Sequence, residues 1–358
     1  MRSNDQEVLE QALRWHQEGL RSVLVTVLST YGASPRPPGA MAVINEHGLI
    51  VGSVSGGCVE DDLVHEVMQG VFWPDTPSTP TAVALRTYGK DAAERERYRL
   101  PCGNALKLAV EGQWQAGDIE RALQSIHQGA SVRKTLRYAT AHVQWQSQAL
   151  VPGLPAHTDF EDDEQGFSVL LGPRHRLLLI GATEVSRYLI PIAQSLGYAV
   201  SVCDPRVEYT GAWTDASVHL IHDMPDDAVV AFSCDERTAG ITVTHDPKLD
   251  DLALMEALKC PAFYVGALGS SITTSKRKSR LQQFDVSAEQ VARLKGPVGL
   301  PIGSRTPAEI AVSIAAELIQ VRSLIRSPAW RSERPPWAPA PATSRFLDRS
   351  WPPARGRA

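Results

Sequence analysis

The fold of the second half of the chain is decided by the stretch from Leu177 to Asp204, which has the sequence LLLIGATEVSRYLIPIAQSLGYAVSVCD. It consists of an apolar run ending at Gly181, an amphipathic segment ending at Gly197, and a second apolar run that leads to Asp204. A buried strand, a crossover helix and another buried strand form the unit from which parallel sheets are built. The stretch therefore predicts an α/β domain with a doubly wound parallel sheet.

Gly181 and Asp204 also suggest a nucleotide site. Asp204 ends the second predicted strand 23 positions after Gly181, where Rossmann-like folds place an acidic residue against a ribose hydroxyl. The glycine pattern is incomplete, because Thr183 and Ser186 stand where its second and third glycines belong. A Cβ at Thr183 crowds the approach of a pyrophosphate to the backbone. We therefore expect a Rossmann-like scaffold that binds NAD(P) weakly.

Two more glycine-rich loops follow in this half of the chain. One runs from Gly266 through Gly269 to Ser270, and the other contains Gly303 and precedes a last helix that opens with a capping box at Thr306. The cations after the first of these loops are Lys276, Arg277, Lys278 and Arg280. Loops that lead into helix N-termini and are backed by cations suit an anion. We expect an anionic ligand at the carboxyl edge of the sheet.

The composition divides the chain of 358 residues into four parts. We expect an N-terminal α/β domain in residues 1–145, a linker in 146–173 where the hydrophobic periodicity fails, and the Rossmann-like domain in 174–325. Residues 326–358 form a Pro/Arg-rich tail, predicted to be flexible, with seven arginines against two acidic residues. The net charge of the chain is −4. Because the tail has a charge of +5, the remaining residues together have a charge of −9. A body of that charge predicts no nucleic-acid binding.

The N-terminal half contains its own regular elements. The pattern predicts a helix over 6–19, a buried β-branched strand over 23–28, strands over 40–44 and 49–54, and a helix that begins after Gly57. Hydrophobic residues make up 43% of the chain, but no apolar run reaches the roughly 18–20 residues that span a bilayer. We expect a cytoplasmic protein without an integral membrane segment.

Cys58 and Cys102 are the cysteines whose surroundings suggest chemistry. Cys58 follows Gly56 and Gly57 at a predicted helix start, where the helix dipole stabilises a thiolate. The carboxylates of Glu60, Asp61 and Asp62, expected to be exposed, oppose this effect in part. Cys102 lies in a loop of small residues.

The surroundings of the other three of the five cysteines do not suggest a chemical function. Cys203 and Cys234 adjoin apolar runs and are expected to be structural, and Cys260 precedes a proline. An odd number of scattered cysteines argues against a disulfide framework. The signatures of zinc proteases, serine hydrolases and dithiol oxidoreductases are absent from the sequence. We expect His245, at a strand end before Asp246 and Pro247, to be structural as well.

Several longer segments together resemble the XdhC/CoxI family, the accessory factors for the maturation of xanthine dehydrogenase and carbon monoxide dehydrogenase. The matching segments are Pro35–Met41, Gly52–Glu60, Thr244–Asp251, Tyr264–Gly269 and Gly299–Ile314. The resemblance extends over about residues 8–325 and includes both predicted domains.

The resemblance implies a function and a set of site residues. Members of this family are chaperones that bind the molybdenum cofactor, support its sulfuration and insert it into a molybdoenzyme of the xanthine oxidase type. It implies that Cys58 and Cys102 contact the molybdenum centre, since thiolates are soft ligands. The cofactor is either molybdopterin or its dinucleotide form. The positions implied to bind it, besides the two cysteines, are Arg36, Gly56, Gly57, Gly181, Asp204, Gly266, Gly269, Ser270 and Gly303.

The implied partners are an apo-molybdoenzyme and a cysteine desulfurase, and we expect a homodimer that acts as a non-catalytic maturation factor. The sequence departs from the family at Thr183 and Glu184, at Ser271 and Ile272, and at Pro301. All these departures fall in the C-terminal domain, so they weaken the case for nucleotide binding more than the case for maturation. Two alternatives stay open, an NAD(P)-dependent oxidoreductase and a protein scaffold without a ligand.

Overall fold

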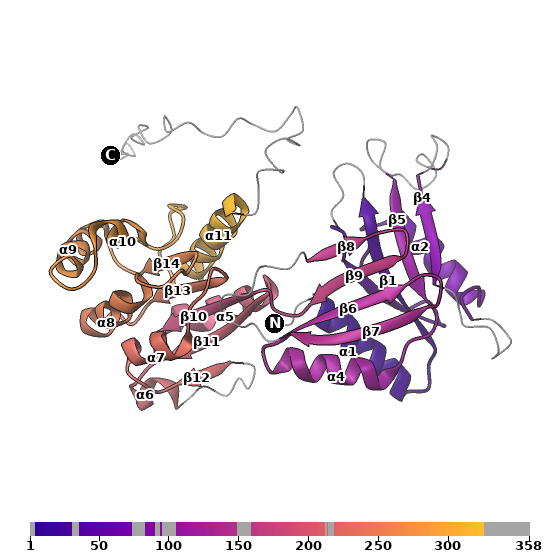
Figure 1. Cartoon of the computed structure of the whole chain (residues 1–358), viewed down its shortest axis with the longest axis horizontal. Helices are drawn as coiled ribbons and strands as arrows, with labels where there is room; N and C mark the ends of the chain where they lie inside the picture. The colour runs from indigo at the N-terminus through magenta and orange to yellow at the C-terminus, as the bar shows by residue number, and fades with distance from the viewer. Residues whose placement is uncertain are drawn as a thin grey trace, which may run out of the picture.

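The computed structural model describes residues 4–30, 36–73, 83–89, 94, 105–148, 159–211, 213 and 218–325 (Figure 1). The described residues form two antiparallel sheets in the N-terminal half and one parallel sheet in the C-terminal half. None of the helices in these ranges combines the length and the apolar character needed to cross a bilayer.

The first sheet has five strands in the order β3-β2-β1-β5-β4. Their bounds are β1 Ser22–Thr30, β2 Met41–Asn45, β3 Ile50–Gly52, β4 Ala84–Tyr88 and β5 Leu106–Glu111. Alternate side chains of β1 enter two cores: Leu24 packs with α1 (Asn4–Gln17) and α4 (Ala116–His127), and Val25 packs with α2 (Cys58–Met68). β1 is therefore buried on both faces, as its continuous apolar run predicts.

The second sheet has the order β7-β6-β9-β8 and overturns part of the predicted linker. Its strands are β6 Ser131–Arg137, β7 His142–Gln148, β8 Phe160–Asp162 and β9 Gly166–Leu171. The linker predicted over 146–173 is thus wrong for β8 and β9. The acidic residues there form a hairpin turn, in which Asp163 Oδ1 accepts the amides of Gln165 at 2.7 Å and Gly166 at 2.9 Å. Such a carboxylate-bound turn looks like a loop in sequence.

The third sheet is parallel, with the strand order β12-β11-β10-β13-β14-β15. Its strands are β10 His175–Ile180, β11 Tyr198–Cys203, β12 His219–Ile221, β13 Thr238–Thr242, β14 Tyr264–Ala267 and β15 Leu294–Lys295. The chain winds from β10 outward to β12 and then returns to β13 on the other side of β10. This is the order of a Rossmann-type fold, so the predicted doubly wound sheet is confirmed.

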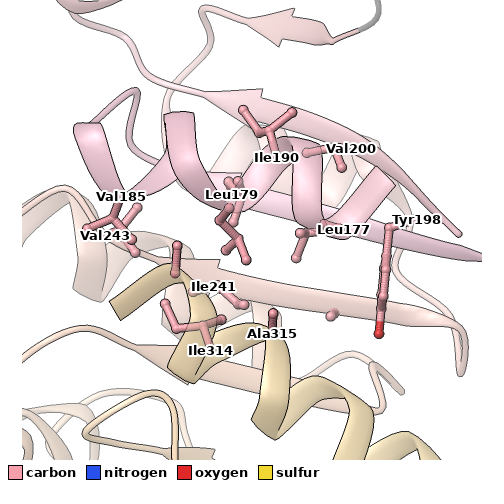
Figure 2. Packing of buried hydrophobic residues seen from close by; sticks show 14 of the residues in the cluster. Leu177, Leu179, Val185, Ile190, Tyr198, Val200, Ile241, Val243, Ile314 and Ala315 are labelled. Atoms are coloured by element: carbon pink, nitrogen blue, oxygen red, sulfur yellow. The ribbon is translucent and has the colours of Figure 1, made fainter. Parts of the chain in front are cut away.

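Helices cover both faces of this sheet. They are α5 Glu184–Ser195, α6 Val207–Thr210, α7 Pro225–Phe232, α8 Pro247–Ala257, α9 Ser271–Leu281, α10 Ala288–Ala292 and α11 Pro307–Ile325. Figure 2 shows one face, where Leu179 and Ile241 from the sheet meet Ile190 of α5 and Ile314 of α11. The core on the other face is formed with α7, α8 and α9. The predicted capping box of α11 is present, since the Thr306 amide donates to Glu309 Oε2 at 2.9 Å.

A buried ion pair joins the two N-terminal sheets. Lys134 of β6 donates to Glu111 of β5, and their side chains are 0% and 2% exposed. The ammonium also lies 5.4 Å from the centroid of the Trp145 ring. Burying two charges is costly, but removing only one partner costs more, because the other charge stays in the core without compensation.

We expect Lys134→Met to lower the free energy of unfolding by about 3–5 kcal/mol, because it leaves Glu111 charged and unpaired. The double variant Lys134→Met/Glu111→Leu should recover most of that loss. Urea denaturation measures both effects. Lys259→Ala, which breaks an exposed pair with Glu256, is the control and should cost less than about 1 kcal/mol. Equal losses for Lys134→Met and Lys259→Ala would contradict the expectation.

Candidate functional site

The carboxyl ends of β10 and β13 form the topological switch point of the parallel sheet. We use the name switch-point edge for these two strand ends with residues 181–183 and 244–246. Gly181 has a φ of +117°, and a Cβ there would lie 2.9 Å from the backbone nitrogen of Thr244. Glycine is therefore required at 181 by the contact between the two loops as well as by its φ. Ligands of doubly wound sheets bind at such a point.

Asp204 lies at the end of β11, next to the switch-point edge, and is fully buried. Its two oxygens accept four hydrogen bonds: from the Ala182 amide at 2.9 Å, from the Arg206 amide at 3.1 Å, and from Arg206 Nε and Nη2 at 2.8 Å each. Burial alone would raise the pKa of Asp204, but these hydrogen bonds outweigh it and the pKa is lowered. The carboxylate predicted to meet a ribose hydroxyl is already bonded within the chain.

Arg206 extends this arrangement toward the end of β13. Its guanidinium carbon lies 4.0 Å from the centroid of the Tyr209 ring. The hydrogen bond to Asp204 raises the pKa of Arg206, and the charge of Asp246 acts in the same direction. A cation after β11 thus lies within electrostatic reach of the turn after β13.

His245 occupies that turn, in a conformation that the sequence did not indicate. Its φ is +63°, a left-handed conformation that non-glycine residues adopt rarely, and it is exposed. The strand before this turn, β13, ends at Thr242. The Thr244 hydroxyl accepts the Asp246 amide at 2.9 Å and lies 2.7 Å from Asp250 Oδ1, to which it donates. The Asp-Pro pair after His245 indicates a turn but carries no signal for its φ.

The cations predicted to hold a phosphate after β14 are used inside the protein. Arg277 is 2% exposed and donates to Asp250 Oδ2 at 2.8 Å and to the Leu268 carbonyl at 3.0 Å. Arg280 donates to Asp251 Oδ2 at 2.8 Å. These two arginines therefore join α9 to α8 and to the loop at Leu268, and only the lysines of that group remain for an external anion.

The glycine-rich loops have structural reasons of their own. Gly266 lies inside β14, where a Cβ would come within 2.7 Å of both Tyr264 and Val298. Ser270 caps α9 by accepting the Thr273 amide at 3.1 Å, and it follows Gly269. Gly303 has a φ of +85° and open space around it. Of the predicted positions 266, 269, 270 and 303, only Gly303 lacks an evident packing or capping reason, and their role toward a ligand stays a prediction.

The backbone amides of the loop before α2 bind a carboxylate of the chain itself, that of Glu60. Glu60 Oε1 accepts the amides of Val54, Ser55 and Gly56 at 2.8–3.0 Å, and Oε2 accepts the amide of Gly57 at 3.0 Å. Burial would raise the pKa of Glu60, but the Ser55 hydroxyl and these amides outweigh it and lower the pKa to about 2. The expectation that Glu60 is exposed to solvent is therefore wrong. Its carboxylate takes the place an external anion would need at Gly56 and Gly57.

The predicted cysteines are placed only in part. Cys58 is the first residue of α2, but its side chain lies outside what is described, as does all of Cys102. Arg36 lies, half buried, in the described turn before β2. Cys203 and Cys234 are buried, as expected, and burial raises the pKa of each thiol to about 12. Among the described residues no group of three or more His, Cys, Asp or Glu side chains is arranged to hold a metal ion.

Comparison with known proteins follows the same division of the chain. The family model for the XdhC Rossmann domain matches residues 177–318, and that for the XdhC and CoxI family matches residues 15–72. The chain belongs to the XdhC/CoxI family. The predicted resemblance is thereby confirmed in both halves of the chain.

Relatives within the XdhC/CoxI family extend over most of the chain. A protein of Escherichia coli (strain K12) named molybdenum cofactor insertion chaperone PaoD is 28% identical over 88% of both chains. A protein of Bacillus subtilis (strain 168), named as a probable xanthine dehydrogenase subunit, is 24% identical over 85% of this chain and 94% of its own. A crystal structure from Bacillus halodurans, described as a xanthine dehydrogenase, has a TM-score of 0.66 at 24% identity and covers 90% of this chain and 97% of its own. That last likeness shows the shared fold.

The lowered pKa of Glu60 predicts a pH-dependent stability. Its ordinary value is 4.5 and its folded value about 2, so the stabilisation is complete above the unfolded pKa and is lost as the pH falls from about 4.5 toward 2. Glu60→Gln should remove this acid dependence and lower the free energy of unfolding near neutral pH by about 1–3 kcal/mol.

Urea denaturation at several pH values measures the effect of Glu60→Gln. Asp61→Asn changes the neighbouring carboxylate, which is exposed, and should shift neither the stability nor its pH dependence by more than about 0.5 kcal/mol. A Glu60→Gln curve that runs parallel to that of the unaltered protein would contradict this account of the loop.

Proposed function

We propose that this protein binds the molybdenum cofactor and assists the maturation of a molybdoenzyme. The observation that carries the proposal is membership of the XdhC/CoxI family together with a 28% identical relative, matched over 88% of both chains, that is named a molybdenum cofactor insertion chaperone. The parallel sheet adds a Rossmann-type switch point, where such folds bind phosphate-bearing ligands. The cofactor is here a cargo that the protein receives and releases.

The finer steps belong to the same proposal. The protein supports sulfuration of the cofactor, with a cysteine desulfurase as partner, and inserts the cofactor into a xanthine dehydrogenase-type apoenzyme. It acts as a homodimer and as a maturation factor without catalysis of its own. The Bacillus subtilis relative, whose name refers to xanthine dehydrogenase, supports this choice of client. The cofactor arrives as molybdopterin or as its dinucleotide form.

The chemistry of the donor groups fits such a cargo in two places. Cys58 at the start of α2 supplies a thiol, and thiolates are soft ligands suited to a molybdenum–sulfur centre. The switch-point edge supplies hydrogen-bond donors for a phosphate. There the Thr183 hydroxyl oxygen is buried and, among the described residues, has no hydrogen-bond partner. A buried hydroxyl without a partner needs an explanation, and a ligand that reaches it would supply one.

The alternative function is an NAD(P)-dependent oxidoreductase. In such enzymes an acidic residue after the second strand holds the ribose. In this chain Asp204 is bonded on both oxygens to Ala182 and Arg206. Thr183 also begins α5 where the nucleotide pattern has glycine. Both features disfavour NAD(P), and the maturation role is the better supported of the two.

The maturation role predicts that the protein carries molybdenum and pterin when purified from a molybdate-supplied host. Cys58→Ser keeps the size of the side chain but removes the soft ligand, so it should lower the molybdenum retained by at least about tenfold. Cys102→Ser should lower it less, because the segment after Cys102 leads into β5 and not into a helix. Metal analysis and pterin fluorescence measure both. Cys260→Ser is the matched control and should retain the full amount.

The same protein should bind NAD(H) only in the millimolar range, as isothermal titration would show. Thr183→Gly removes the crowding Cβ and should strengthen binding modestly, because Asp204 stays bonded to Arg206. Saturable NAD(H) binding at micromolar concentration, or reduction of a substrate with NADH, would instead favour the oxidoreductase.

A further inference from the structure

His245 combines a left-handed backbone conformation with an exposed side chain. Its φ of +63° is easily adopted by glycine and is costly for a residue with a Cβ. The imidazole is exposed, and it has no hydrogen bond, ion pair or ring contact with any described residue. The side chain therefore does not stabilise the turn in which it stands. A strained residue of this kind indicates a role outside the folded chain.

Hydrogen bonds of the neighbouring residues fix the turn around His245. The Thr244 hydroxyl accepts the amide of Asp246 at 2.9 Å, and Asp246 Oδ1 accepts the amide of Lys248 at 2.9 Å. Thr244 also donates to Asp250 Oδ1 at 2.7 Å. These bonds bind the residues on both sides of His245, so the position of its Cα and the direction of its Cβ are set by its neighbours.

Asp250, which accepts the Thr244 hydroxyl, also forms a buried ion pair with Arg277. Asp250 is 1% exposed and Arg277 is 2% exposed, with 2.8 Å between Oδ2 and Nη2. A well-packed apolar pair of similar volume often stabilises a protein as much as a buried ion pair does. Stability alone therefore does not account for two buried charges here. Because Asp250 also accepts the Thr244 hydroxyl, we infer that the pair orients the turn.

The place of His245 in the sheet favours a phosphate-bearing ligand. The turn touches Gly181, and its Asp246 lies within electrostatic reach of Arg206. The Thr183 hydroxyl in the facing loop has no partner among the described residues. Thr183, Arg206 and His245 thus follow the carboxyl ends of three neighbouring strands, β10, β11 and β13, the edge where doubly wound sheets bind phosphate groups.

We propose that His245 contacts the ligand at the switch-point edge and donates a hydrogen bond to a phosphate group of the cargo, and that Thr244 is the residue that positions it. This assignment rests on the proposed function for the identity of the cargo. It concerns one imidazole and one phosphate group, whether that group belongs to molybdopterin or to its dinucleotide form.

His245→Gly tests the assignment in two ways, because it removes the imidazole and relieves the strained φ at once. The variant should melt at a higher temperature than the unaltered protein, since glycine adopts a positive φ without strain. It should also bind inorganic pyrophosphate about tenfold more weakly in isothermal titration, the loss expected for one hydrogen bond to a charged group. The molybdenum and pterin retained on purification should fall with it.

Ser233→Gly is the matched control. Ser233 also has a positive φ, +50°, but it follows α7 and precedes β13, at the opposite edge of the sheet. This variant should gain stability while its pyrophosphate affinity stays unchanged. If His245→Gly instead melts at a lower temperature, or keeps full pyrophosphate affinity, the assignment of His245 is overturned.

Two substitutions test the positioning role of Thr244. Thr244→Val keeps the volume and removes the hydroxyl that joins Asp246 and Asp250, so pyrophosphate affinity should fall although His245 is present. Thr244→Ser restores the hydroxyl and should restore the affinity. Equal affinities for the Val and Ser variants would show that the hydroxyl does not act through His245.

The failure of this inference is distinguishable from failure of the proposed function. If the unaltered protein retains molybdenum and pterin and His245→Gly retains as much, the function stands and the role of His245 is wrong. If no cofactor is retained but pyrophosphate binding depends on His245, the phosphate contact stands with another cargo. If the unaltered protein neither retains the cofactor nor binds pyrophosphate, the inference is overturned.

Discussion

The contact between Gly181 and Thr244 is the constraint on which the candidate site of the parallel sheet depends. Because residue 181 has no Cβ, the loop after β10 approaches the end of β13 to within contact distance of its backbone. Thr244 then uses its hydroxyl to join Asp246 and Asp250. Gly181 therefore sets how closely the two central strand ends approach, and Thr244 sets the conformation of the turn that presents His245. The packing of these two loops therefore also determines the geometry of the candidate site.

Two carboxylates occupy places that the sequence suggested for ligands. Glu60 accepts hydrogen bonds from the amides before α2, and Asp204 accepts one from the Ala182 amide near the start of α5. A carboxylate of the chain satisfies the same donors that would attract a phosphate or another anion. The amides of both loops are consequently occupied. An external ligand must be bound by other groups. At the switch-point edge such a group is the exposed imidazole of His245.

Buried ion pairs recur where separate elements have to be held in register. Lys134 and Glu111 join the two N-terminal sheets, and Arg277 and Asp250 join α9 to α8. In each case the cost of desolvation is offset by a bond whose direction is specific, which apolar contacts do not provide. For a protein proposed to receive and release a cargo, the second pair keeps the ligand-facing turn in place without relying on the ligand itself.

Local signals in the sequence determined much of the fold. The apolar run of β1, the alternation of strands and helices after residue 174, and the capping box at Thr306 and Glu309 all depend on residues close together in the chain, and the structure contains each of them. The hairpin of β8 and β9 did not show in the pattern, because β8 is short and β9 pairs with β6, which is distant in the sequence. Which donors Glu60 and Asp204 accept, and the left-handed φ of His245, were decided only by tertiary structure. A side chain's partner depends on which element packs beside it, and that is set by strand order and long-range contacts that no local pattern encodes.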